Sequence, residues 1–124
     1  KLMPSKKLSP ILIQLLNLIN NKFNCKFNGI LVNYYIDGNE YIGKHSDDEG
    51  NLGVEGVIAI SYGAIRKFRI RDKKTNKIIQ DIPTDPTKII QMCGDFQKEF
   101  THEIPVEKKV KEPRYSFTFR KHLE

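Results

Sequence analysis

Apolar side chains recur at helical spacing near the start of the chain, between residues 11 and 19. Ser9 and Pro10 stand directly before this stretch. A serine can cap a helix, and proline at the first helical position loses no hydrogen bond. We therefore expect a helix over residues 10–22. Because the apolar stretch is too short to span a bilayer, no membrane association is expected.

After the helix, apolar and polar residues alternate with a period of two, which is typical of strands. The expected strands cover residues 29–36, 54–61, 66–71, 78–82, 88–92 and 114–121. One helix followed by short strands favours a mainly β fold, a β-sandwich or jelly roll with the helix packed on the outside. At 124 residues, the chain 1–124 is expected to form a single domain.

The chain carries 21 Lys and Arg against 15 Asp and Glu, a formal net charge of +6. Lys67, Arg69 and Arg71 share one face of an expected strand, and a lysine-rich loop follows at 72–77. These groups could bind nucleic-acid phosphates, but a solvated basic surface explains them equally well. Charge therefore gives only mild support for a nucleic-acid partner.

Cys25 and Cys93 are the only cysteines, and they form no C-x-x-C pair. A disulfide framework and a thiolate zinc site are therefore not expected. This cysteine usage fits a reducing intracellular compartment, the cytoplasm or the nucleus.

His45, Ser46 and Asp47 form an H-x-D motif, and alternation places the imidazole and the carboxylate on one side. A second imidazole would complete the two-His, one-carboxylate facial triad that holds Fe(II) with open positions. We give His122 no weight, because it lies in a segment that resembles a cloning remnant, so His102 is the candidate. The alternatives are a surface turn for the motif and a structural role for the second histidine.

The last expected strand alternates between an aromatic and a polar face. The aromatic set is Tyr115, Phe117 and Phe119, and the polar set is Arg114, Ser116, Thr118 and Arg120. The polar face is either solvent-exposed or the wall of a cavity. Two guanidiniums inside a cavity would call for a small dianion, since buried arginines need partners. Asn33 and Tyr35 share a face of the first strand and either join such a cavity or bond nearby backbone.

Several of these motifs together resemble the AlkB family, in particular its eukaryotic-type DNA repair members. The resemblance rests on N-Y-Y-I-D-G and I-G-K-H-S-D-D-E within 33–49, S-Y-G-A at 61–64 with Arg66 and Phe68, His102, and R-Y-S-F-T-F-R at 114–120. The family consists of Fe(II)- and 2-oxoglutarate-dependent dioxygenases with a double-stranded β-helix, a kind of jelly roll. The resemblance implies that fold here, with Fe(II), 2-oxoglutarate and O2 as cofactor and cosubstrates.

The resemblance also implies a role for each matching residue. It assigns His45, Asp47 and His102 to the catalytic Fe(II) site; Asn33, Tyr35, Arg114, Thr118 and Arg120 to 2-oxoglutarate; and Asp48 and Glu49 to the substrate base. The implied reaction removes N-alkyl groups from nucleobases in DNA or RNA and releases formaldehyde, succinate and CO2. A 2-oxoglutarate oxygenase of a protein or small molecule, and a non-enzymatic nucleic-acid-binding domain, are the alternatives.

The family that the chain resembles carries an N-terminal lid over the base, and we expect this sequence to begin too late to contain one. We expect either an N-terminally truncated domain or a minimal member with a more open site. In both cases a monomer acting on alkylated nucleic acid, with no membrane partner, is expected.

Overall fold

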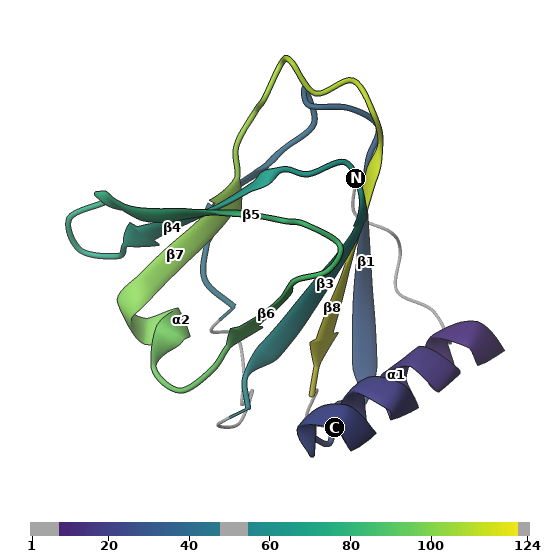
Figure 1. Ribbon diagram of the computed structural model, residues 1–124. Helices are drawn as coiled ribbons and strands as arrows, with labels where there is room; N and C mark the ends of the chain where they lie inside the picture. The colour runs from purple at the N-terminus through teal and green to yellow at the C-terminus, as the bar shows by residue number, and fades with distance from the viewer. Residues whose placement is uncertain (1–7, 48–54, 122–124) are drawn as a thin grey trace.

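The chain forms one outer helix and eight strands in two four-stranded sheets, as a computed structural model of residues 8–47 and 55–121 describes (Figure 1). Helix α1 spans Pro10–Phe23. The Ser9 side chain accepts a hydrogen bond from the Leu12 N–H, and Asn24 ends the helix in the left-handed conformation, at φ 53°. The predicted helix is therefore confirmed, with both ends explained by local chemistry.

Both sheets are antiparallel and they face each other. The first has the order β1 (Gly29–Tyr35), β8 (Arg114–Arg120), β3 (Val57–Gly63) and β6 (Ile89–Met92). The second has the order β2 (Ile42–His45), β7 (Phe100–Ile104), β4 (Lys67–Asp72) and β5 (Ile78–Pro83). The predicted mainly β jelly roll with an outer helix is confirmed.

The β1–β8–β3–β6 sheet is buried on both faces. Val57, which is fully buried, packs between the sheets with Phe68 and Ile104. Its neighbour Ile58, also fully buried, points the other way and packs under α1 with Leu16. Because side chains alternate along a strand, a helix on one face leaves the other face for the interior between the sheets.

The described residues include three elements that the sequence pattern did not predict: β2, β7 and the short helix α2 (Phe96–Glu99). His102 therefore lies in the middle of β7, within the range 93–113 where no strand was expected. Tyr62 and Gly63, expected in a link between strands, form the end of β3. None of the helices in the described ranges is long and apolar enough to cross a membrane.

Candidate functional site

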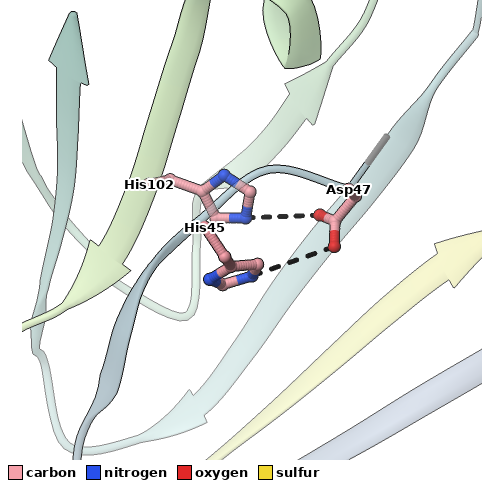
Figure 2. A group of neighbouring side chains, drawn as sticks. All are labelled: His45, Asp47 and His102. Carbon is pink, nitrogen blue, oxygen red and sulfur yellow. Dashed lines mark ion pairs between the residues drawn. The ribbon is translucent and has the colours of Figure 1, made fainter. Parts of the chain in front are cut away.

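Two histidines and an aspartate meet at one end of the space between the sheets (Figure 2). His45 ends β2 and is the register partner of His102 on β7, while Asp47 lies two residues beyond β2. The Nε2 atoms of His45 and His102 are 3.8 Å and 3.3 Å from the two carboxylate oxygens of Asp47. One ligand atom from each residue lies within 4.8 Å of the others, so a single ion could contact all three.

The chemistry of this donor set fits Fe(II). The Nδ1 of His45 is 2.9 Å from the Gly43 carbonyl oxygen; a proton on Nδ1 leaves Nε2 as a lone-pair donor. Burial alone would raise the pKa of Asp47, but His102 and the Arg120 guanidinium together hold that pKa below its usual value. Two neutral imidazoles and an ionised carboxylate are the ligands of the facial triad.

A cavity of about 250 Å³ extends from this triad between the two sheets. Its lining includes every predicted iron or 2-oxoglutarate residue: Asn33, Tyr35, His45, Asp47, His102, Arg114, Thr118 and Arg120. The remaining wall is largely apolar and includes Leu31, Ala59 and Met92. Of the two interpretations of the last strand, the cavity wall is the correct one.

Arg114 is a buried cation with open donors. It is 3% exposed, and its Nη2 donates a hydrogen bond to Ser61 Oγ at 2.9 Å. Its Nε and Nη1 have no hydrogen-bond partner among the described residues, and neither does the buried Asn33 Oδ1. Burial lowers the pKa of Arg114, although a guanidinium stays charged in proteins. Unpaired donors on a buried cation fit a carboxylate ligand such as that of 2-oxoglutarate.

Arg120 lies at the triad end of the same strand face. Its Nη1 is 3.6 Å from Asp47 Oδ1, while its Nε has no partner in the described part of the chain. Thr118 is buried between the two arginines along β8. The cavity therefore carries positive charge at both ends of β8 and one carboxylate at the triad.

A family model described as the 2OG-Fe(II) oxygenase superfamily matches residues 2–120. The chain belongs to this superfamily. Within it, the chain is 34% identical over 126 residues to the Bos taurus "Alpha-ketoglutarate-dependent dioxygenase alkB homolog 3", covering 94% of this chain and 44% of that protein. It is 33% identical over 122 residues to the Homo sapiens "DNA oxidative demethylase ALKBH2", covering 92% and 47%.

These similarities support membership of the AlkB family, and the chain spans less than half the length of these two relatives. Among solved structures, a Pseudomonas putida prolyl-4-hydroxylase matches with a TM-score of 0.43 and 15% identity, over 90% of this chain and 63% of that one. Fe(II), 2-oxoglutarate and O2 are the cofactor and cosubstrates that the superfamily implies, and the triad fits the metal.

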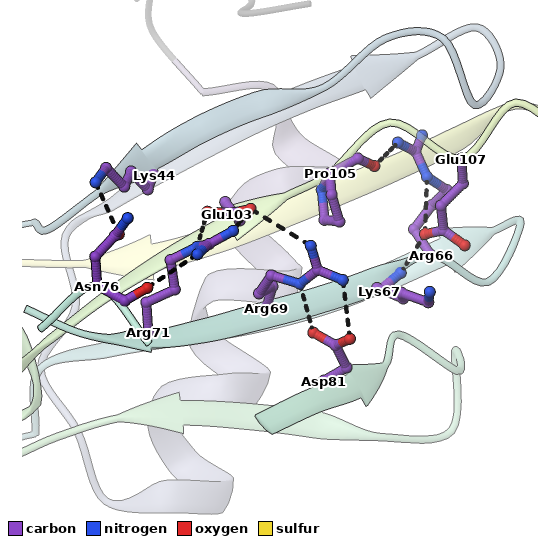
Figure 3. Close-up of polar contacts among 10 residues, drawn as sticks. All are labelled: Lys44, Arg66, Lys67, Arg69, Arg71, Asn76, Asp81, Glu103, Pro105 and Glu107. Atoms are coloured by element: carbon purple, nitrogen blue, oxygen red, sulfur yellow. Dashed lines mark hydrogen bonds and ion pairs between the residues drawn. The ribbon is translucent and has the colours of Figure 1, made fainter. Parts of the chain in front are cut away.

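Next to the candidate site lies Arg66, a residue of the resemblance motif to which the sequence analysis assigned no role. Arg66 is 1% exposed, and its guanidinium donates hydrogen bonds to the carbonyl oxygens of Asp37, Glu40 and Pro105 at 3.2, 2.8 and 2.7 Å. Figure 3 shows the contact between the Arg66 guanidinium and the Pro105 carbonyl oxygen. The central carbon of the same guanidinium lies 5.5 Å from the ring centre of Tyr35. Because these three partners are backbone carbonyl groups, which every residue has, the pattern of side chains along the sequence does not reveal the contacts.

Two of the basic side chains considered for phosphate binding are already paired within the protein (Figure 3). Arg69 contacts Asp81 at 2.9 Å, and Arg71 contacts Glu103 at 2.9 Å. These ion pairs offset the positive charge of both arginines. Asp48 and Glu49 lie outside the described residues, and their contact with the substrate base stays a prediction.

Proposed function

We propose that this chain is the catalytic core of an Fe(II)- and 2-oxoglutarate-dependent dioxygenase that oxidatively demethylates N-alkylated nucleobases in DNA or RNA. One observation carries the proposal: a single cavity holds a facial triad at one end and, further along, a buried guanidinium with two unpaired nitrogens. One similar protein, ALKBH2 of Homo sapiens, is named as a DNA oxidative demethylase, which supports the nucleic-acid substrate. The chain is expected to act as a monomer in the cytoplasm or nucleus.

The residues divide the work between metal and cosubstrate. His45, Asp47 and His102 would hold Fe(II), and the ionised carboxylate would offset part of the metal's charge. Arg114, assisted by Asn33 and Tyr35, would bind the distal carboxylate of 2-oxoglutarate. Arg120 and Thr118 would complete the pocket nearer the triad. The apolar part of the wall would keep bulk water from the reacting groups.

Iron and 2-oxoglutarate, when bound, would use O2 to hydroxylate an N-methyl group, giving succinate and CO2, and the hydroxymethyl product would release formaldehyde. The protein would therefore need to bring the methylated base to the triad end of the cavity. In a duplex this requires flipping the base out of the stack, a cost that is lower for a damaged pair. Asp48 and Glu49, which directly follow Asp47, are the predicted contacts to that base.

The test is a panel of methylated single- and double-stranded DNA and RNA oligonucleotides incubated with Fe(II), 2-oxoglutarate and O2. Loss of the mass of one CH2 unit from the oligonucleotide, as hydrogen replaces the methyl group, with stoichiometric succinate and formaldehyde, supports the proposal. Unmethylated oligonucleotides and the His45→Ala variant are the controls and should give no formaldehyde. Hydroxylation of peptides or small molecules, with every oligonucleotide unchanged, would refute it.

A further inference from the structure

The two histidines of the triad lie on strands, whereas the aspartate lies beyond the end of one. His45 and His102 lie on paired strands, whose backbone hydrogen bonds fix their positions. Asp47 lies beyond the end of β2, next to a register shift between Ile42 and His45, so no strand ladder fixes it. The Asp47 residue is nevertheless only 7% exposed, and its carboxylate must keep one orientation to serve the same ion as the imidazoles.

Two polar side chains join this segment to the region that leads into β7. The Oε1 of Gln97, on α2, accepts a hydrogen bond from the Asp47 backbone N–H at 2.7 Å. The hydroxyl of Ser46 donates to the Phe100 carbonyl oxygen at 2.7 Å. These contacts connect the residues at 46–47 with those at 97–100, which include the first residue of the strand that carries His102.

Gln97 is itself fixed in place. It is 8% exposed, and its Nε2 lies 3.8 Å from Met92 Sδ at the end of β6. The amide therefore presents its oxygen to Asp47 and its nitrogen to the sulfur, so the acceptor is already in position before any ion binds. Burying a polar amide costs free energy, and an apolar side chain would fill the same space without that cost. Packing alone therefore does not explain a buried glutamine whose oxygen accepts a hydrogen bond from a backbone N–H.

We propose that Gln97, together with Ser46, is a positioning residue that sets metal affinity by holding Asp47 against the two histidines. The inference deepens the proposed function, because it rests on the triad being the metal site. Neither side chain would touch the ion. Partners that orient metal ligands are worth about 10–100-fold in metal affinity, and these two contacts belong to that class.

The experiment measures anaerobic Co(II) binding, by isothermal titration and by the visible absorption of the bound ion, on the whole chain without nucleic acid. Gln97→Leu removes the acceptor but keeps the side-chain size, and should weaken Co(II) binding by about tenfold or more and alter the absorption spectrum. Gln91→Leu is the matched control: that glutamine is exposed on β6, bonds the Glu55 carbonyl, and should leave both readouts unchanged.

Ser46 provides an independent pair of variants should Gln97→Leu fail to fold. Ser46→Ala should weaken Co(II) binding, and Ser46→Thr, which keeps the hydroxyl, should restore it. The proposal is overturned if folded Gln97→Leu, or Ser46→Ala in its place, binds Co(II) with the affinity and spectrum of the parent. A parent that binds Co(II) but demethylates no oligonucleotide would refute the proposed substrate and leave this inference standing.

Discussion

At the scale of single residues, Arg114 combines burial with incomplete pairing. Its bond to Ser61 fixes one end of the guanidinium, which leaves Nε and Nη1 without partners among the described residues. The guanidinium carbon lies 5.0 Å from the centre of the Tyr35 ring, in a cation–π contact. This contact does not supply the negative charge that a carboxylate would. Leaving a charged donor buried and unpaired costs free energy, which a bound carboxylate would recover as paired, charge-assisted bonds.

Replacing Arg114 by Ala should therefore weaken 2-oxoglutarate binding far more than metal binding. A hydrogen bond to a charged group contributes about 1.5–3 kcal/mol, which corresponds to roughly a 10–100-fold loss of affinity. The measurement is calorimetric titration of 2-oxoglutarate into the Mn(II)-loaded chain, with Mn(II) affinity measured separately. Arg69→Ala removes a half-buried arginine of the other sheet and should change neither value. Equal cosubstrate affinity in the Arg114 variant and the parent would contradict the assignment.

Sequence reasoning found residues whose type and spacing indicate a site. It missed the roles of residues whose partners are backbone groups. His45, Asp47 and Arg114 were found because their residue types and spacing carry chemistry that is rare outside a site. Gln97 was missed, and Arg66 was noted only within a motif and given no role, because both act on backbone groups far away along the chain, and any segment supplies such groups. Supporting residues of this type become visible only when the fold brings the two segments together.

At the scale of elements, the strands that carry the metal ligands were not predicted, because the ligands themselves are polar. In β7, residues 100, 102 and 104 belong to one side, and the middle one is His102. A polar ligand at an inward position breaks the alternation that identifies a strand, so the strand was not predicted. β2 has only four residues and an irregular register, so its alternation of apolar and polar residues is too short to predict a strand. The clean alternation of β8, by contrast, predicted its first residue, its end to within one residue and its polar inner face.

Arg66 stabilises the junction between the β1–β2 loop and the segment after β7. Replacing it by Met should leave the carbonyl oxygens of Asp37, Glu40 and Pro105 without their present donor. Breaking a buried charged network of this kind costs about 3–5 kcal/mol, so the free energy of unfolding should fall by that amount. Chemical denaturation followed by circular dichroism measures it.

Arg69→Met is the matched control for this experiment, because Arg69 makes its ion pairs near the surface. Its loss should cost at most about 1 kcal/mol. If both variants lose the same small amount, Arg66 does not have the stabilising role that its contacts indicate.

The β4–β5 hairpin should make part of the stability dependent on pH. The bond from Arg69 lowers the pKa of Asp81 in the folded chain. Because the folded pKa lies below the unfolded one, this contribution is present above about pH 4 and disappears as the pH falls through the folded pKa. Asp81→Asn should therefore lose up to about 1 kcal/mol at pH 7, less if solvent screens the pair strongly, and nothing at the most acid pH. Urea unfolding at a series of pH values tests this; a constant difference would contradict it.

At the scale of the whole molecule, the two sheets carry different parts of the candidate site. The imidazoles belong to β2 and β7 of one sheet, whereas the predicted 2-oxoglutarate residues belong to β1 and β8 of the other. Arg120, on β8, contacts Asp47 across the cavity. A jelly roll suits this division because it places the inner faces of two sheets against each other and leaves room for a small ligand between them.

This division predicts that metal and cosubstrate stabilise the chain cooperatively. A ligand at a hundredfold excess over its Kd adds about 2.7 kcal/mol to the free energy of unfolding. 2-Oxoglutarate should add more in the presence of Mn(II) than alone, because its keto-acid end can bind the ion while its distal carboxylate binds Arg114. Glutarate, which has the same two carboxylates but no keto group, is the matched control, and its effect should simply add to that of Mn(II).

Thermal unfolding with each ligand alone and with both measures this coupling. Arg114→Ala should keep the Mn(II) shift in Tm and lose the extra shift that 2-oxoglutarate provides, whereas Asp47→Ala should lose both. Strictly additive shifts for 2-oxoglutarate and Mn(II) would mean that the two ligands do not meet. The triad and the buried guanidinium would then be separate features of the cavity, and a shared reaction centre between the two sheets would be ruled out.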